Sequence, residues 1–171
     1  MKKLLRGGFV VTPRGSRRAD VLLDGEKIAQ VGHISPAEAK SAEVTDVSGC
    51  YLFPGFIDAH VHVESSMVSP PAYCTEALGW GTTTLVTDPH EIANVAGGAG
   101  VRFMLDTSAK LPVNYYVQLP SCVPATPFEH AGEVFTAEKM KPFTEEPRVL
   151  GLGEMMNYPG VIQGDARMHA E

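Results

Sequence analysis

The sequence has few cysteines, no basic run and no long apolar segment, and each shortage argues against a class of protein. Three cysteines, Cys50, Cys74 and Cys122, occur among 171 residues without a CxxC spacing. We interpret them as reduced, buried thiols of a cytoplasmic protein rather than a disulfide framework. The net charge is −6, which argues against a nucleic-acid partner. No apolar stretch is long enough for a signal peptide or a membrane helix.

The composition is that of an ordinary soluble globular protein, with 44% hydrophobic and 20% charged residues. The first fifty residues contain short β-branched and apolar runs, and Asp24-Gly25 separates two of them as in a β-hairpin. A further short strand is predicted over Asp46–Leu52. We predict that residues 1–50 form part of a small β-sandwich domain, because these strands are too few to bury two faces by themselves.

From Phe53 onward the pattern alternates between strand and helix. The strand starts recur at intervals of roughly thirty residues, the length of a βαβ unit. No GxGxxG follows the first strand, which disfavours an open dinucleotide-binding sheet. Polar residues collect after each strand, which is typical of a parallel barrel with its site at the carboxyl ends. The predicted strands are Phe53–Ala59, Thr82–Thr87, Val113–Leu119 and Val149–Leu152, and the predicted helices are Pro70–Trp80, Ala99–Ser108 and Thr136–Phe143.

His60-Val61-His62 ends the first of these strands. Residues two apart on a strand face the same side, so both imidazoles can reach one metal ion. The strand is nearly all apolar, and we expect it to be buried on both faces, as in a parallel sheet. The alternative is a pair of core histidines that form only local hydrogen bonds.

Other strand ends supply further candidate ligands. Glu154 follows the fourth strand, and His90 and Glu91 follow the second. A carboxylate opposite a histidine pair can bridge two metal ions. The alternatives are an ion pair at the barrel mouth for Glu154, and a helix-capping loop for His90 and Glu91.

Four stretches of sequence, residues 54–67, 81–95, 121–126 and 151–162, together resemble one enzyme family. Phe-Ile-Asp-Ala-His-Val-His, from Phe56, resembles the first-strand signature of the amidohydrolase superfamily. The motifs HVESSM, DPHEIANV and GEMMNYPGVI, in this order and spacing, are similar to those of the bacterial adenine deaminases, as is the segment SCVPAT at 121–126. The resemblance covers nearly the whole chain.

The resemblance implies metal-dependent hydrolysis of adenine to hypoxanthine and ammonia, a purine-salvage reaction, at a pair of iron or manganese ions, with zinc as another possibility. It makes His60 and His62 ligands of one metal. It makes Glu154 the bridging acid, in the place of a carboxylated lysine in many relatives; no lysine follows Lys141 in this chain. Glu91 and Glu64 are candidates for proton transfer or substrate binding, His90 for an additional metal, and Ser121 for substrate binding.

Length is the main departure from the family. A (β/α)8 barrel needs about 200 residues or more, and later strands of the superfamily supply two histidines and a catalytic aspartate. We therefore expect an α/β chain that is the N-terminal half of a (β/α)8 metallo-hydrolase barrel. Residues 51–171 would form its first four units, inactive alone and either homo-oligomeric or dependent on a missing C-terminal half. Two other functions stay open: another cyclic-amide hydrolase, similar to dihydropyrimidinase, and a non-catalytic remnant or binding module.

Overall fold

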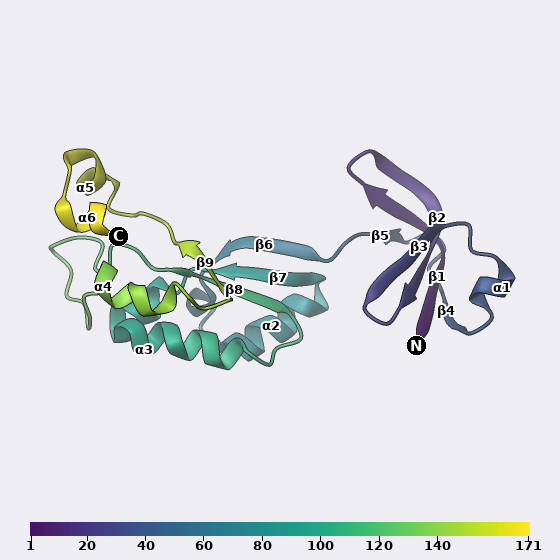
Figure 1. Ribbon diagram of the computed structural model, residues 1–171, viewed down its shortest axis with the longest axis horizontal. Helices are drawn as coiled ribbons and strands as arrows, with labels where there is room; N and C mark the ends of the chain where they lie inside the picture. The colour runs from purple at the N-terminus through teal and green to yellow at the C-terminus, as the bar shows by residue number, and fades with distance from the viewer. The chain divides into compact units, whose positions relative to one another are not determined.

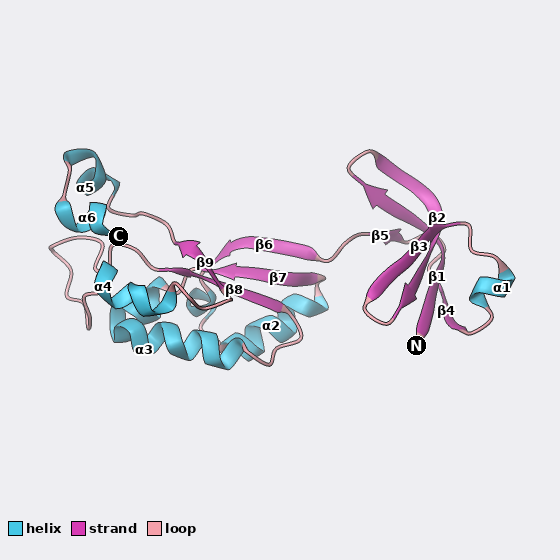
Figure 2. Cartoon of the chain, viewed as in Figure 1, coloured by secondary structure: helices cyan, strands magenta, loops and turns pink.

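The computed structural model describes residues 1–171 and divides them into two units, Met1–Pro54 and Gly55–Glu171 (Figure 1). Unit 1 is almost entirely strand, whereas unit 2 alternates strands with helices (Figure 2). The fold class is therefore mixed α/β. No helix combines the length and the apolar character needed to cross a membrane.

Unit 1 is built on its first strand, which pairs on both sides. The sheet order is β3-β2-β1-β4, and β5 also pairs with β1. The β1–β2 and β2–β3 pairs are antiparallel, whereas β4 and β5 run parallel to β1. Asp24 pairs with Lys27 across a turn in which Gly25 has φ +60°, so the predicted Asp-Gly hairpin is confirmed. The elements are β1 (Lys2–Thr12), β2 (Gly15–Asp24), β3 (Lys27–Gly32), α1 (Pro36–Ala39), β4 (Ala42–Asp46) and β5 (Tyr51–Leu52).

The core of unit 1 is small, with Leu4, Leu22 and Ile34 as its buried cluster. The prediction of a strand over Asp46–Leu52 is wrong for most of its length. Asp46 accepts a hydrogen bond from the backbone N–H of Ser48, and this local turn ends β4 before the chain extends again. Cys50 lies in the same turn region and is exposed, so the prediction that all three thiols are buried is wrong for this one.

Unit 2 contains a four-stranded sheet in which the order in space equals the order in sequence, β6-β7-β8-β9. All three strand pairs are parallel, so the carboxyl ends of the four strands meet at one edge. The strands are β6 (Phe56–Val61), β7 (Thr82–Thr87), β8 (Asn114–Leu119) and β9 (Val149–Leu152).

Helices cover one face of this sheet (Figure 1). The buried core lies between that face and the helices, and Leu85, Val101, Met104, Val117 and Phe135 are among its members. The elements are the 3-10 helix η1 (Val63–Ser66), α2 (Pro70–Gly79), α3 (His90–Ser108), α4 (Ala137–Met140), η2 (Lys141–Phe143), α5 (Tyr158–Gln163) and α6 (Ala166–Ala170).

The prediction that the first strand of unit 2 is buried on both faces is wrong. Ile57 is 66% exposed in β6 and Leu150 is 55% exposed in β9. The helices pack on the opposite face, so these apolar side chains have no covering layer within residues 1–171. An apolar run shows that a strand can be buried, but the layer that covers it is set by the tertiary structure.

Helix α3 begins nine positions before its predicted start, at His90 rather than Ala99. Its interior is broken at Gly97, where φ is +55° and ψ is −135°, a conformation that favours glycine. The predicted helix therefore corresponds to the second half of α3, and the first half brings His90 and Glu91 onto its first turn. The predicted helix over Thr136–Phe143 is split into α4 and η2 at Lys141-Pro142.

Candidate metal centre

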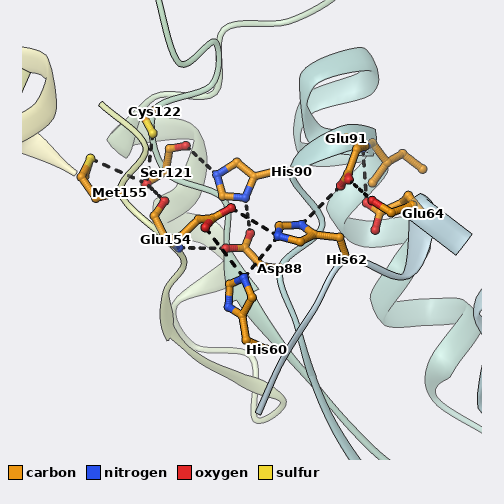
Figure 3. Close-up of polar contacts among 12 residues, drawn as sticks. His60, His62, Glu64, Asp88, His90, Glu91, Ser121, Cys122, Glu154 and Met155 are labelled. Atoms are coloured by element: carbon orange, nitrogen blue, oxygen red, sulfur yellow. Dashed lines mark hydrogen bonds and ion pairs between the residues drawn. The ribbon is translucent and has the colours of Figure 1, made fainter. Parts of the chain in front are cut away.

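His60 and His62 lie at the carboxyl end of β6, and their side chains point to the same place (Figure 3). Their Nε2 atoms are 3.2 Å apart, and the two rings meet edge to face at 76°. This is the arrangement expected for histidines two apart on a strand. Two nitrogen lone pairs at this distance repel each other unless a proton or a cation lies between them.

Glu154 follows β9 and reaches the same point. Its Oε1 lies 3.2 Å from Nε2 of His62 and its Oε2 lies 3.9 Å from Nε2 of His60. One ligand atom from each of the three residues lies within 4.8 Å of the others. Imidazole nitrogen and carboxylate oxygen are donors that divalent iron, manganese and zinc accept. The residues present therefore fit a divalent cation, and the chemistry of this donor set is the reason.

Glu91 lies on the other side of the His62 ring. Its Oε2 is 3.5 Å from Nδ1 of His62, a buried atom that makes no hydrogen bond. The hydroxyl of Ser65 donates to Oε1 of Glu91 at 2.6 Å. A carboxylate behind a histidine commonly fixes the tautomer and orientation of a metal-binding ring. The first turn of α3 thus supports His62 from behind.

His90 pairs with Asp88 rather than with the two other histidines. Nδ1 of His90 is 2.5 Å from Oδ1 of Asp88, and Nε2 is 3.0 Å from the carbonyl oxygen of Ser121. Burial alone would lower the pKa of His90, but its contacts with Asp88, Cys122 and Ser121 outweigh burial and raise the pKa to about 10. In this arrangement Nδ1 of His90 faces a carboxylate and Nε2 faces a carbonyl oxygen, and a metal-binding role for His90 stays a prediction.

Ser121 and Glu64, two further residues predicted from the sequence, lie near the site but are not among the three residues that converge there. Ser121 is fully buried, and its hydroxyl donates to the carbonyl of Glu154 at 2.6 Å. Glu64 accepts the backbone N–H of Ile92 at 3.3 Å, and burial raises the pKa of its carboxyl group. Neither side chain lines the pocket described next, so a direct contact of either with substrate stays a prediction.

A pocket of about 320 Å³ opens beside the histidine pair. Its polar side includes His62, Glu91 and Glu154, and its other side is formed by the segment from Cys122 to Ala125 with Met156. The apolar part can lie against a flat ring while the polar part meets its functional groups. The α6 residue Arg167 donates to the carbonyl of Val123 at 2.6 Å and holds this wall in place.

The sequence reasoning missed Asp88 and Cys122. Asp88 stands at the end of β7, two residues before His90, and its side chain is fully buried. The sequence Thr-Asp-Pro-His gave a signal, because an aspartate at a parallel strand end falls on the same edge as the other candidates. Cys122 has φ +44° and is buried; burial would raise the pKa of its thiol, but hydrogen bonds with His90 and Ser121 lower it.

Comparisons with known proteins agree with this geometry. The model of the amidohydrolase family matches residues 51–170. The adenine deaminase of Desulfitobacterium hafniense (strain Y51) is 52% identical over 149 residues, 87% of this chain and 25% of that protein. The chain thus spans about a quarter of the length of the curated relatives it matches.

Two solved structures have a similar fold. The dihydropyrimidinase of Brevibacillus agri NCHU1002 has a TM-score of 0.61 and 24% identity, covering 98% of this chain and 38% of that one. A mutant of the atrazine chlorohydrolase of Arthrobacter aurescens TC1, complexed with zinc and atraton, has the same TM-score at 16% identity, covering 95% and 50%. These likenesses concern the fold, and the family match covers most of the sequence. The chain belongs to the amidohydrolase family.

Proposed function

We propose that this chain carries part of the active site of an enzyme that hydrolyses adenine to hypoxanthine and ammonia. The observation that carries the proposal is the convergence of His60, His62 and Glu154 beside a pocket that two of them, His62 and Glu154, line. Sequence identity near 50% to proteins named adenine deaminase supports adenine as the substrate. On this proposal, residues 51–171 form the first four units of a (β/α)8 barrel, and residues 1–50 belong to a small β-sandwich domain.

The proposed cofactor is a divalent metal pair of iron or manganese, with zinc also compatible with the donor set. His60 and His62 would bind one metal and Glu154 would lie between the two. When bound, the metal provides Lewis acidity and lowers the pKa of a water molecule toward neutrality. Glu91 keeps the ring of His62 oriented so that Nε2 faces the site, since its carboxylate is the acceptor beside Nδ1.

The pocket supplies the place for the purine. Val123, Pro124 and Met156 give an apolar wall against which a flat base can lie. In the reaction, water adds at C6, and the amino group must gain a proton before it leaves as ammonia. Glu91 is the carboxylate of this pocket beside His62, and we propose it as a candidate for that proton transfer.

The number of metal ligands in residues 1–171 limits the activity that we propose for this chain by itself. One histidine pair and one carboxylate give about three ligands, whereas two divalent ions need five or more for firm binding. The other ligands must therefore come from outside these residues. We propose that the chain acts in the cytoplasm as part of a larger protein or assembly, and that by itself it does not turn over adenine.

A chimera tests the proposal directly. This chain would replace the matching quarter of the Desulfitobacterium hafniense protein, and the purified product would be supplied with Mn²⁺ and assayed for ammonia release from adenine. We expect deamination, and its loss in Glu154→Gln. His33→Ala, which changes an exposed histidine of unit 1, should leave the activity unchanged. A folded, metal-loaded chimera that leaves adenine intact would contradict the proposal.

The same chimera separates the second candidate function. A D-hydantoinase structure is 28% identical to this chain with a TM-score of 0.56, over 72% of this chain and 28% of that one. Hydrolysis of a cyclic amide would give ring opening of hydantoin instead of ammonia from adenine. Activity on hydantoin alone would favour that function.

A further inference from the structure

Four polar contacts close into a ring that passes through the backbone of Glu154 (Figure 3). Asp88 Oδ2 accepts the backbone N–H of Glu154 at 2.8 Å, and Asp88 Oδ1 pairs with Nδ1 of His90 at 2.5 Å. Nε2 of His90 donates to the carbonyl of Ser121 at 3.0 Å, because a carbonyl oxygen can only accept. The hydroxyl of Ser121 then donates to the carbonyl of Glu154 at 2.6 Å.

The ring holds the chain on both sides of the Cα atom of Glu154. One contact fixes the N–H that precedes this atom and the other fixes the carbonyl that follows it. Rotation of either peptide would break a contact, so the ring sets the direction in which the Cα–Cβ bond of Glu154 leaves the backbone. That direction brings the carboxylate to 3.2 Å from His62.

The members of the ring other than Glu154 are deeply buried. Asp88 and Ser121 are fully buried and His90 is 6% exposed. Water cannot easily replace a lost partner at such a depth, so each contact is costly to break. The exposed part of the arrangement is the side chain of Glu154, which is 43% exposed.

Gly153 gives independent support for this close fit. A Cβ atom at this position would lie 2.2 Å from Oδ2 of Asp88 and 2.8 Å from Oδ1. These distances are far inside van der Waals contact, so the aspartate sits where any other residue would place a side chain. The backbone of β9 can approach Asp88 only because position 153 is glycine.

A second interpretation of the same residues is a separate cation site. His62, Asp88 and His90 offer ligand atoms within 4.8 Å of one another. Both nitrogens of His90 already face acceptors, however, so a cation there would have to displace one of the ring contacts. The observed distances favour the closed ring, which consists of three hydrogen bonds and the ion pair between Asp88 and His90.

We propose that Asp88 and Ser121, linked through His90, are positioning residues that aim the Glu154 carboxylate at His60 and His62. The inference rests on the proposed metal role of Glu154. It assigns to Ser121 a contact with the backbone of Glu154 in place of the substrate contact expected from the sequence. It also gives Asp88 a function that does not require contact with the metal or the substrate.

Binding of Co²⁺ to the full 171-residue chain tests the ring. The affinity is measured by competition with a chelator, and the visible absorption of the bound Co²⁺ reports the ligand geometry. Ser121→Ala deletes one oxygen and is the variant that disturbs packing least. Gly153→Ala displaces Asp88 without changing any member of the ring, and Gly79→Ala is its matched control, because a Cβ there meets no atom within 4 Å.

We expect Ser121→Ala and Gly153→Ala each to weaken Co²⁺ binding ~10–100-fold and to shift the absorption bands, with Gly79→Ala unchanged. Thermal melting of the metal-free variants is recorded in parallel, and binding is measured where every variant is folded. A purely structural role would lower the melting temperature and leave the affinity and spectrum of the folded protein as they were.

Glu154→Gln separates this inference from the proposed function. If Glu154→Gln weakens Co²⁺ binding while Ser121→Ala and Gly153→Ala bind like the parent chain, the ring does not position the carboxylate and the inference is overturned. If Glu154→Gln itself binds Co²⁺ like the parent, Glu154 is not a ligand, and both the metal centre and the inference are overturned.

Discussion

Units 1 and 2 both contain a pleated sheet, but they differ in what the sheet supports. The sheet of unit 1 has five strands including β1, and its buried cluster consists of Leu4, Leu22 and Ile34. Unit 2 pairs four parallel strands and buries a much larger core under α2 and α3. The strand ends of unit 2 bring together His60, His62 and Glu154, whereas the one histidine of unit 1, His33, is exposed. A parallel sheet therefore concentrates chemistry at one edge, because its side chains arrive from several strands at once.

The cysteines offer the largest contrast between the units. Cys50 of unit 1 is exposed, whereas Cys74 of unit 2 is fully buried, and burial raises the pKa of its thiol to about 11. The thiolate is the reactive form, and at pH 8 only ~10⁻³ of the buried Cys74 is thiolate. We expect Cys50 to be alkylated faster than Cys74 by a factor on the order of 10⁴, since local opening is also required.

Mass spectrometry after timed alkylation measures both rates in one sample. The rate for Cys74 should rise with pH, because the thiolate is the form that reacts. Unfolding in denaturant should make the two cysteines equal. Equal rates in the native chain would show that α2 does not protect its thiol.

Core substitutions compare the stability of the two units. Leu85 and Leu4 are both fully buried, so each change to alanine removes the same atoms. Leu85→Ala should cost about 3–5 kcal/mol, because the large core around it relaxes only partially. Leu4→Ala should cost less, near 2 kcal/mol, because the small cluster of unit 1 can collapse around the gap. Hydrogen exchange followed by mass spectrometry reads each unit separately, and an equal loss of protection would remove the distinction.

One carboxylate from each unit extends the comparison to metal binding. Glu38 of unit 1 accepts the backbone N–H and the hydroxyl of Ser35, completing the capping box of α1. Glu91 of unit 2 lies behind His62. Glu91→Gln should weaken Mn²⁺ binding about tenfold, because the amide orients the His62 ring less firmly than the carboxylate. Glu38→Gln should leave it unchanged in the same chelator competition, and the reverse result would separate Glu91 from the metal centre.

Much of the sheet of unit 2 could be predicted from the sequence, because its strands are short β-branched runs at regular spacing. The four predicted strands agree with β6, β7, β8 and β9 to within a few residues, and the period of two places His60 and His62 on one face. The convergence of Glu154 with them follows from parallel strands meeting at one edge. These predictions need only local pattern and one rule of topology.

Other features depend on tertiary packing and could not be predicted. The open face of β6 depends on which side the helices pack, and an apolar run such as Phe56-Ile57 is compatible with either side. The pairing of His90 with Asp88 depends on the early start of α3 at His90. The glycines near Gly97 disfavour a helix, so the sequence pattern does not predict that start. The orientation of Ser121 depends on the position of Glu154, a residue from another strand.

The agreement between strand order in space and in sequence also bears on how the unit forms. Each strand pairs with the one that precedes it, so a chain emerging from the ribosome can add one strand and helix at a time without waiting for distant segments. The metal-binding group is different, because His60 and His62 arrive with β6 and Glu154 only after β9. The three proposed metal ligands therefore meet only after β9 has paired, when the four-stranded sheet is complete.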